Sequence, residues 1–295
     1  MLNFAKLTLN DIETVRPFLR FQKSRICDYS VGGIFMWREY FKTQFTIFKN
    51  TLLFKVRYLN GTTAFTVPIG EKQQEALIKL ESYCRENFMP LVFCTVPDNS
   101  IGLLAERYPR ATVKQERNWY DYLYRTQDLI DLKGRKYDGQ RNHIHKFHKL
   151  YPDFSFKEIN EENLTYVKDF YAELHKNHPK PSPIAKEESY RTAELLDNYK
   201  KYGLFGGCIV TDGTIVSMSI GERVNDTLFV HVEKADIRYQ GVYQVAMQEF
   251  LKHFAGENDT FVNREEDVGD AGLRKSKLSY HPAELLKKST VQVNI

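Results

Sequence analysis

The sequence predicts an α+β protein of two domains, each a mixed and mostly antiparallel sheet flanked by helices. The first observation is the length of 295 residues, which fits two units of about 130–150 residues. The second is a composition of 42% hydrophobic, 14% aromatic and 27% charged residues, typical of a folded chain with a core. The third is that both halves of the chain alternate strand-like apolar runs with helix-like segments.

The first half begins with a helical pattern over residues 9–21, for which Thr8 or Asn10 is a suitable N-terminal cap. Two strand-like runs follow at 45–48 and 51–58, and a two-residue turn signal separates them. The chain therefore opens with a helix followed by a β-hairpin.

The remainder of the first half continues with short strands and amphipathic helices. Residues 64–67 form a strand pattern that a proline ends. Residues 73–87 form a helical pattern, because Leu77, Leu80 and Cys84 are three and four positions apart. The same reasoning predicts a strand at 91–96, a helix at 100–108 and a strand at 119–124.

The second half repeats this organisation without visible sequence identity to the first. Three of its strand patterns form an antiparallel meander, because the pairs Asp212-Gly213 and Asn225-Asp226 are two-residue hairpin turns. The predicted strands of this half are 154–159, 204–210, 214–221, 227–232 and 260–262, and the predicted helices are 140–151, 163–176, 186–202, 240–254 and 271–279.

The junction between the two halves is weakly marked. We place an N-terminal domain at residues 1–125, a linker at 126–138 and a C-terminal domain at 139–295. The C-terminal domain is expected to carry the functional site, because most of the polar motifs described below lie in it.

Several classes of protein are disfavoured by composition. No run approaches the roughly 20 apolar residues of a membrane-spanning helix, and the N-terminus lacks the basic head and apolar block of a signal peptide. The four cysteines are Cys27, Cys84, Cys94 and Cys208. They are scattered without metal-ligand or disulfide spacing, so neither a zinc site nor a disulfide framework is predicted. We therefore expect a cytoplasmic protein without a bound metal.

The net charge of +4 is too small to predict nucleic-acid binding by itself. Basic residues are nevertheless concentrated at 133–149, a segment that contains six lysines and arginines, three histidines and only one acidic residue. Arg141, His145 and His148 share one face of the predicted helix at positions i, i+4 and i+7. This face suits the phosphates of a tRNA or of an anionic lipid, and a solvated basic helix is the alternative.

A short motif stands where the predicted helix at 240–254 begins. It reads Arg-Tyr-Gln-Gly-Val-Tyr over 238–243 and resembles the cofactor loop of the GNAT (N-acetyltransferase-type) superfamily, Arg/Gln-x-x-Gly-x-Gly/Ala. Backbone N–H groups of that loop bind the pyrophosphate of an acyl-CoA. The cofactor-binding candidates are Arg238, Gln240 and Gly241. Tyr243 stands where a second small residue is expected, so ordinary acyl-CoA binding is disfavoured.

Three polar stretches carry a family resemblance, at residues 133–147, 231–235 and 263–280. They resemble a bacterial family of uncharacterised proteins related to the C-terminal domain of phosphatidylglycerol lysyltransferase. The resemblance implies two tandem GNAT-like domains and a relation to the Fem-type aminoacyl transferases. It also implies aminoacyl-tRNA as the donor. In the lysyltransferases that this chain resembles, lysine passes from lysyl-tRNA to the glycerol headgroup of a lipid.

His231 and Glu233 are the first two candidate catalytic residues. Regular alternation along their strand puts both on one face, close to the start of the following helix. An amine or hydroxyl that attacks an ester loses a proton, and a carboxylate or imidazole at this place can accept it. The alternative is a buried His–Glu pair that holds the sheet edge.

The densest polar run is residues 263–267, directly after an apolar strand. Ligands of open sheets bind beyond the ends of strands, so Asp267 is a third catalytic candidate and is expected to clamp an ammonium group together with Glu265. Arg274 and Lys277 lie one helical turn apart and are expected to face the same anion. The substrate-binding candidates are Asn263, Arg264, Glu265, Arg274, Lys277, Arg141 and His145. We expect His231, Glu233 and residues 263–267 to converge on one hollow.

These patterns predict an acyl or aminoacyl transferase. The expected reaction moves an aminoacyl group from aminoacyl-tRNA to a lipid headgroup, a peptide or another amine or hydroxyl acceptor. Positioning and electrostatic stabilisation are expected to do most of the work, because no nucleophile motif is present. If the acceptor is a lipid, we expect the protein to act at the inner face of the membrane. The expected partners are tRNA and anionic lipid, and DNA is not expected. The alternatives are an acyl-CoA-dependent N-acetyltransferase and a non-catalytic GNAT-fold protein that binds an anionic ligand.

Overall fold

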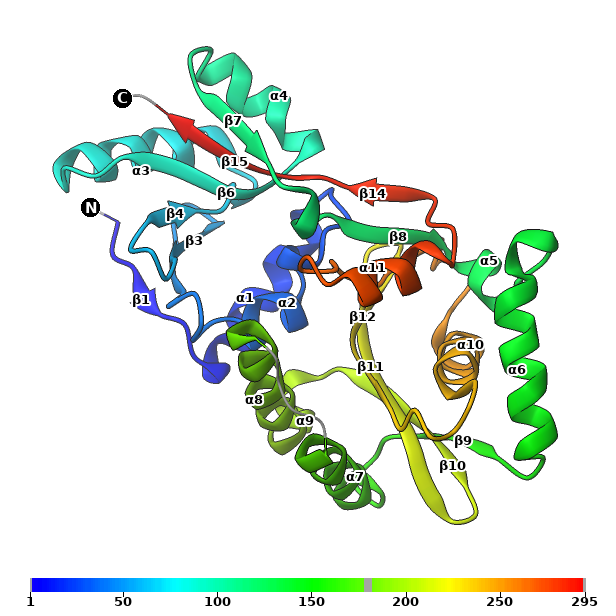
Figure 1. Cartoon of the computed structure of the whole chain (residues 1–295). Coiled ribbons are helices and arrows are strands. Elements are labelled where there is room, and N and C mark those ends of the chain that lie inside the picture. Colours follow the sequence, from blue (N-terminus) through cyan, green and yellow to red (C-terminus); the bar gives the residue numbers. More distant parts are fainter. Residues whose placement is uncertain (1, 178–181, 294–295) are drawn as a thin grey trace. The chain divides into compact units, whose positions relative to one another are not determined.

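The computed structural model describes residues 2–177 and 182–293. The chain forms two compact units (Figure 1). Unit 1 consists of two segments, one that ends at Asp121 and one that begins at Leu286. Unit 2 is the segment Tyr122–Leu285 between them. Among the described residues, no helix is long and apolar enough to cross a membrane.

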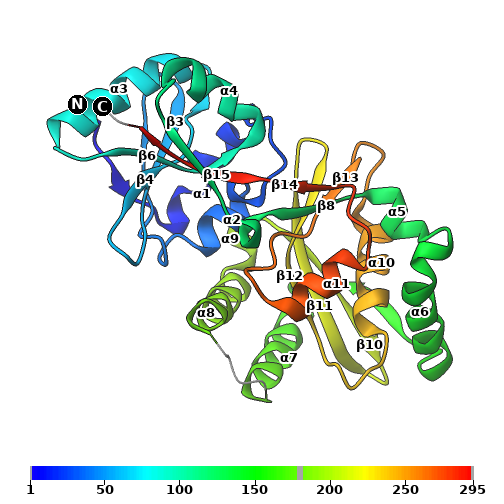
Figure 2. The same cartoon turned by 45° about the horizontal axis from the view of Figure 1, so that its top comes forward.

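Unit 1 contains an eight-stranded mixed sheet. The strand order is β1-β2-β3-β4-β6-β15-β7, and β5 pairs with β3. The strands are β1 Ala5–Lys6, β2 Gln44–Ile47, β3 Thr51–Arg57, β4 Thr63–Phe65, β5 Ile69–Gly70, β6 Leu91–Pro97, β7 Thr112–Gln115 and β15 Lys288–Val293. Paired strands run antiparallel except β4 and β6, which are parallel. Figure 2 shows β15, the last strand of the chain, beside β6.

Short helices surround this sheet. They are α1 Ile12–Val15, α2 Val31–Met36, α3 Gln73–Glu86 and α4 Asp98–Arg107, with 3-10 turns at Leu9–Asp11, Arg16–Phe21, Cys27–Tyr29 and Arg117–Trp119. The helix expected at 9–21 is divided, because Pro17 lacks the N–H group of a continuous helix and the segment tightens into 3-10 turns. The expected amphipathic helix is present as α3, which buries Leu77, Leu80 and Cys84.

Unit 2 contains a seven-stranded mixed sheet in the order β14-β8-β13-β12-β11-β10-β9. The strands are β8 Asp121–Arg125, β9 Ser155–Glu158, β10 Phe205–Thr211, β11 Thr214–Val224, β12 Thr227–Ala235, β13 Phe261–Asn263 and β14 Glu284–Leu286. The predicted meander is present as β10, β11 and β12, which pair antiparallel. Strands β12 and β13 are parallel, as a strand–helix–strand crossover requires.

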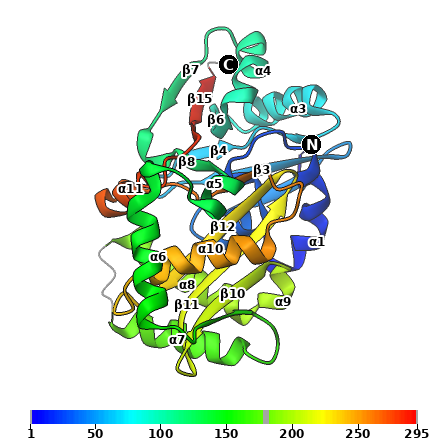
Figure 3. The same ribbon diagram turned by 90° about the vertical axis from the view of Figure 1, so that its right-hand side faces the viewer.

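Helices cover both faces of the unit 2 sheet. They are α5 Thr126–Asp131, α6 Asp138–Leu150, α7 Leu164–Asn177, α8 Pro183–Asp197, α9 Tyr199–Tyr202, α10 Val242–Phe254 and α11 Ala271–Leu278, with a 3-10 turn at Arg135–Tyr137. Figures 1 and 3 show α10 and α6 on one side of strands β10–β12 and α7 and α8 on the other. We call these sides the α10 face and the α8 face. The core of the unit lies on the α10 face, where Leu228 and Val230 pack among the residues of α10.

The predicted α+β class with two mixed, mostly antiparallel sheets flanked by helices is confirmed. The expected division of the chain differs from the observed one in two places. The proposed linker at 126–138 is not a bare connection, because it carries α5 and a 3-10 turn whose Leu129 and Tyr137 are buried in the core of unit 2. The end of the chain does not stay with the second half, because β15 pairs with β6 and β7 of unit 1.

Candidate functional site

One irregularity in the unit 2 sheet decides how the site is built. Ile220 and Gly221 are adjacent on β11, but their partners on β12 are two positions apart, so His231 is an extra residue on β12 and forms a β-bulge. A single extra residue reverses the alternation of side chains beyond it. The prediction that His231 and Glu233 share one face of the sheet is therefore wrong.

His231 lies on the α8 face. Its ring is nearly parallel to that of Phe229, at 10° and 6.1 Å between centroids, and Phe229 pairs with Glu222 of β11. Glu233 lies on the other face, because the next residue, Lys234, points to α8 and contacts Glu188 there at 2.5 Å.

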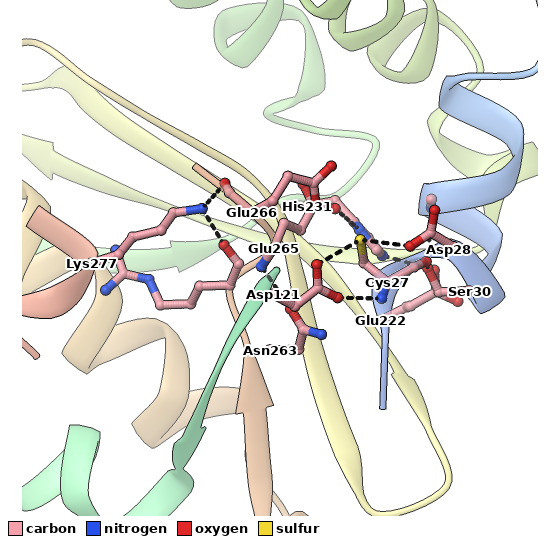
Figure 4. A network of polar contacts seen from close by, with 12 residues as sticks. Cys27, Asp28, Ser30, Asp121, Glu222, His231, Asn263, Glu265, Glu266 and Lys277 are labelled. Atoms are coloured by element: carbon pink, nitrogen blue, oxygen red, sulfur yellow. Dashed lines mark hydrogen bonds and ion pairs between the residues drawn. The ribbon is translucent and has the colours of Figure 1, made fainter. Parts of the chain in front are cut away.

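Two carboxylates hold the imidazole of His231 (Figure 4). Its Nε2 lies 2.8 Å from Oε1 of Glu222, and its Nδ1 lies 2.7 Å from Oε1 of Glu265. The side chain of His231 is fully buried, whereas that of Glu265 keeps 23% of its surface exposed. Both ring nitrogens donate only in the imidazolium form, so this geometry fits a protonated ring between two carboxylates.

The protonation of this trio follows from burial and charge. Burial alone lowers the pKa of His231, but hydrogen bonds and charge from Glu222 and Glu265 outweigh it and raise the pKa to about 10. Burial raises the pKa of Glu265, and the contact with His231 opposes this rise. His231 therefore has no free lone pair with which to accept a proton at neutral pH, and Glu265 is the more exposed titratable group of the trio.

The backbone after β13 positions Glu265. The amide N–H of Glu265 donates to Oδ1 of Asn263 at 2.6 Å, and Glu265 takes the left-handed conformation with φ +56. The carbonyl of Glu265 accepts a hydrogen bond from the N–H of Tyr122 at 3.1 Å. Asn263 thus acts on the conformation of the chain, and the strained φ of Glu265 aims its side chain at the bulge.

A second ion pair lies on the α10 face. Arg264 donates through Nε to Oε2 of Glu233 at 3.0 Å and through a second nitrogen to Oε1 at 3.2 Å. The guanidinium stands over the rings of Tyr280 and Tyr124, at 4.7 and 5.8 Å from their centroids. Burial alone lowers the pKa of Arg264, but the charge of Glu233 outweighs it, so the pKa is raised. Arg264 and Glu233 therefore form a bidentate ion pair, while Nη1 of Arg264 is buried and has no hydrogen-bond partner among the described residues.

Asp267 is bound on all sides by donors. Arg274 donates to its two oxygens at 2.8 and 2.7 Å, and Tyr122 donates its hydroxyl at 2.6 Å. The backbone N–H of Gly269 adds a contact at 2.9 Å. Burial alone raises the pKa of Asp267, but these hydrogen bonds outweigh it and hold the pKa well below its usual range. The side chain of Asp267 is fully buried, so this carboxylate holds the loop and α11 together.

Lys277 braces the same loop from α11 (Figure 4). Its Nζ donates to the backbone carbonyls of Arg264 and Glu266, each at 2.5 Å, and burial lowers the pKa of Lys277. The expectation that Arg274 and Lys277 face one anion is wrong, since Arg274 binds Asp267 and Lys277 binds carbonyl oxygens. The expected single hollow is also not found, because the two faces of the sheet separate Glu233 and Arg264 from His231 and Glu265.

The basic helix keeps part of its expected face. Arg141 donates to the carbonyls of Leu132 and Gly134 and contacts Asp138 closely. Its guanidinium therefore closes the end of α5 onto α6 and is not directed at an outside phosphate. His145 is exposed on the surface of α6, as the helical pattern requires.

The predicted cofactor loop has a structural explanation. Arg238 donates to the carboxylate of Asp236, and Gln240 is exposed. Gly241 has φ +87, and a Cβ at this position would lie 2.2 Å from the carbonyl oxygen of His143 on α6. The glycine is thus required where α10 begins against α6, and its presence does not depend on a phosphate.

Two polar groups escaped the sequence analysis. Glu222 is the acidic residue of β11, whose other residues except Arg223 are uncharged, and a carboxylate in such a strand was the available signal. The second is a cluster in unit 1, where Nζ of Lys288 lies 2.6 Å from both Asp28 and Asp121 and 3.3 Å from Sγ of Cys27. The ligand atoms of Cys27, Asp28 and Asp121 lie within 4.8 Å of one another, and the ammonium group of Lys288 supplies a positive charge among them.

Comparison with known proteins defines the relationships of the chain. The model of the family described as phosphatidylglycerol lysyltransferase, C-terminal, matches residues 19–292. A curated relative, an uncharacterised protein of Mycoplasmoides gallisepticum, is 27% identical over 175 residues, which are 59% of this chain and 56% of that protein. The match thus spans about half the length of that relative.

Solved structures extend the comparison to the fold. A conserved protein of unknown function from Bacteroides thetaiotaomicron is 32% identical, covers 100% of both chains and has a TM-score of 0.93. The structure of L-PGS from Bacillus licheniformis is 12% identical, covers 95% of this chain and 91% of that chain, and has a TM-score of 0.64. The last likeness is one of fold.

Proposed function

Because the chain belongs to the family of phosphatidylglycerol lysyltransferase C-terminal domains, we propose that it is an aminoacyltransferase. Its reaction moves an aminoacyl group from an aminoacyl-tRNA to an amine or hydroxyl acceptor, with a lipid headgroup as the first acceptor to test. The observation that carries this proposal is the family match over residues 19–292, which includes every residue of the Glu222–His231–Glu265 network.

The chemistry needs a group that handles one proton. The acceptor oxygen or nitrogen attacks the ester carbonyl of the aminoacyl-tRNA, a new bond to carbon forms, and the bond to the ribose oxygen breaks. The acceptor loses its proton, and the departing ribose oxygen gains one. We assign this transfer to Glu265, because its side chain is partly exposed and its raised pKa brings it nearer to neutral pH, where a group can accept and return a proton.

His231 is the positioning residue in this proposal. Its imidazolium, buried between Glu222 and Glu265, holds Glu265 in one orientation and keeps its charge balanced while the carboxyl changes protonation. The other charged candidates have a structural role, because their contacts with one another and with backbone carbonyls hold the loop that carries Glu265. They are Glu233, Arg264, Asp267, Arg274 and Lys277.

Two partners follow from this reaction. The donor brings a tRNA, for which the exposed basic residues of α6, such as His145 and Lys146, offer contacts to phosphate. A lipid acceptor brings an anionic membrane surface, which basic residues approach through charge. An acyl-CoA cofactor has less support, because Asp236 binds the arginine of the candidate loop and packing on α6 explains Gly241.

The test is incubation of the full chain with a mixture of charged tRNAs and total bacterial lipid, followed by mass spectrometry of aminoacylated products. We expect a lipid that carries one amino acid, and we expect Glu265→Gln to lower its rate of formation about a hundredfold, as loss of a general base does. Glu257→Gln is the matched control, since Glu257 is an exposed glutamate of the same unit. Absence of any aminoacylated product, or an unchanged rate in Glu265→Gln, overturns the proposal.

A further inference from the structure

A cluster of polar side chains in unit 1 has no part in the proposed transfer reaction. It consists of Cys27, Asp28, Asp121 and Lys288, which come from both segments of that unit. Lys288 is the first residue of β15 and pairs with Pro97 of β6. The cluster therefore connects the segment before α2 with the last strand of the sheet.

The backbone that carries the sulfur of Cys27 is held on two sides. The N–H of Cys27 donates to Oδ2 of Asp121 at 2.7 Å, and its carbonyl accepts a hydrogen bond from the hydroxyl of Ser30 at 2.6 Å. A Cβ on Gly33 of α2 would lie 2.0 Å from the same carbonyl oxygen, so α2 packs directly on this backbone. Cys27 keeps only 6% of its surface exposed.

The sulfur of Cys27 and the amine of Lys288 are in direct contact. Nζ of Lys288 lies 3.3 Å from Sγ, and the same Nζ lies 2.6 Å from both Asp28 and Asp121. Sγ in turn lies 3.6 Å from Oδ1 of Asp121 (Figure 4). The side chain of Asp28 is 26% exposed, so the cluster reaches solvent at that carboxylate. An oxidisable sulfur and a primary amine are thus held together beside two carboxylates that can accept their protons.

The charges of the cluster favour oxidation of this sulfur. Asp121 is placed to accept the thiol proton, and the ammonium group of Lys288 stabilises the thiolate, which is the form that reacts with peroxides. The other cysteines differ. Burial raises the pKa of the Cys84 and Cys208 thiols to about 11 and that of the Cys94 thiol to about 12. These three cysteines are therefore expected to stay as thiols and to serve as internal controls.

We propose that Cys27 and Lys288 form a modification site, at which a peroxide joins the two side chains through a sulfur–nitrogen bond. In the first step the thiolate attacks hydrogen peroxide. A sulfur–oxygen bond forms, the oxygen–oxygen bond breaks, and the sulfur is oxidised by two electrons to a sulfenic acid while one oxygen leaves as water.

The second step joins the two residues. The ammonium group of Lys288 passes one proton to a carboxylate, and the lone pair of Nζ attacks the sulfur of the sulfenic acid. The sulfur–nitrogen bond forms, the sulfur–oxygen bond breaks, and the hydroxide leaves as water with a second proton from Nζ. One thiol, one ammonium group and one peroxide thus give one sulfenamide, two waters and one proton, which Asp28 can pass to solvent.

Two other interpretations of the cluster fit less well. A metal ion bound by Cys27, Asp28 and Asp121 would have to displace the ammonium group, which already lies 2.6 Å from both carboxylates. A purely structural ion pair needs the lysine and the aspartates, but not a sulfur in contact with the amine. The modification is independent of the proposed transferase activity, because all of its residues belong to unit 1.

The test is treatment of the full chain with hydrogen peroxide, followed by proteolysis and mass spectrometry. We expect a linked pair of peptides that contains Cys27 and Lys288 and weighs two hydrogens less than the separate peptides. Dithiothreitol should release both peptides, since a thiol reduces the sulfur–nitrogen bond. Lys288→Arg is the matched variant, because its guanidinium keeps the positive charge between the aspartates but stays protonated and offers no lone pair. We expect no linked pair in this variant.

Thermal unfolding gives a second measurement. The bond closes a loop that contains all of unit 2, since unit 2 lies between the two segments of unit 1. A long closed loop restricts the unfolded chain, so dithiothreitol should lower the melting temperature of the oxidised wild type by about 5 °C or more. The melting temperature of peroxide-treated Lys288→Arg or Cys27→Ser should not respond to dithiothreitol.

The wild-type mass spectrum decides the outcome, so a variant that fails to fold does not obscure it. The proposal is overturned if peroxide leaves the Cys27 peptide unlinked, or if it links Cys27 to a residue other than Lys288. Oxidation of Cys84, Cys94 or Cys208 before Cys27 also overturns it. The transfer assay is not used in any of these measurements, so the two proposals fail separately.

Discussion

Arg264 and Glu265 are neighbours in the sequence, yet they bind partners on opposite faces of the unit 2 sheet. Arg264 donates to Glu233 at 3.0 Å, and Glu265 contacts His231 at 2.7 Å. Strand β12 supplies both partners because of its bulge at His231. Two ion networks therefore lie back to back, and substitutions on the two faces should have different consequences.

Glu233→Gln is expected to destabilise the protein. The substitution leaves the buried guanidinium of Arg264 without a charged partner, which costs about 3 kcal/mol of unfolding free energy. Urea denaturation followed by circular dichroism measures the change. Glu161→Gln is the control, because it breaks a contact with Lys200 in which both side chains are more than 80% exposed, and such pairs contribute little. An unchanged urea midpoint for Glu233→Gln would show that the buried pair is not required.

The imidazole of His231 is expected to stay protonated across the physiological range. Its pKa is raised to about 10 in the folded state, above the value of about 6.5 in an unfolded chain. The stabilisation is therefore fully present below about pH 6.5 and is lost as the pH rises through 10. The ring resonances of His231 in NMR spectra should not titrate between about pH 6 and 8. A midpoint inside that interval contradicts the two-carboxylate contact.

Asp267 is expected to contribute stability that acid removes. Its pKa is lowered in the folded state, so the contribution is present above the unfolded value of about 3.8 and is lost as the pH falls through the folded value. Asp267→Asn should have a lower melting temperature than the wild type at pH 7, and the difference between the two melting temperatures should become smaller in acid. Thermal melts at a series of pH values measure this. If the difference in melting temperature between Asp267→Asn and the wild type does not change with pH, the ionised carboxylate is not the cause of the loss of stability.

Gly241→Ala is expected to destabilise unit 2 by more than about 2 kcal/mol. The added Cβ would meet the carbonyl of His143, and the backbone at this position has φ +87. Gly139→Ala provides the comparison, since nothing lies within 4 Å of its added Cβ and alanine favours the first turn of α6. In chemical denaturation, the midpoint of Gly241→Ala should fall below that of the wild type, and the midpoint of Gly139→Ala should rise above it. Equal stability of Gly241→Ala and wild type removes the packing explanation for this glycine.

Acetyl-CoA is expected not to bind. Asp236 occupies the arginine of the candidate loop, and Tyr243 follows where a second small residue is needed for close approach of phosphate. Calorimetric titration of the wild type should show heats of dilution only. Saturable binding that Arg238→Ala abolishes would instead support the acyl-CoA-dependent alternative.

The strands of the meander could be predicted from local patterns, but their side-chain faces could not. Alternation and the turn signals Asp212-Gly213 and Asn225-Asp226 identify β10, β11 and β12, because both are properties of neighbouring residues. The bulge at His231 depends on which residues pair across two strands, and nothing in the local pattern encodes that register. For this reason Glu233 was expected on the wrong face.

The chemical content of the site could be predicted only in part. The polar run that follows β13 was identified because it stands at the end of an apolar strand. The partners of Asp267, Lys277 and Arg141 were missed, because hydrogen bonds to Tyr122 and to backbone carbonyls join residues that are distant in sequence. A charged residue in a sequence shows that a partner is needed, but not which group provides it.

By itself the sequence determined the fold class, most of the helices and strands, and the polar segments from which the site is made, since periodicity and turn chemistry act over a few residues. Only the tertiary structure decided that β15 returns to the sheet of unit 1, that Glu222 and Glu265 hold His231, and that Arg264 turns away from them. These outcomes follow from strand register and from the need of each buried charge for a partner, and both are settled by long-range contacts.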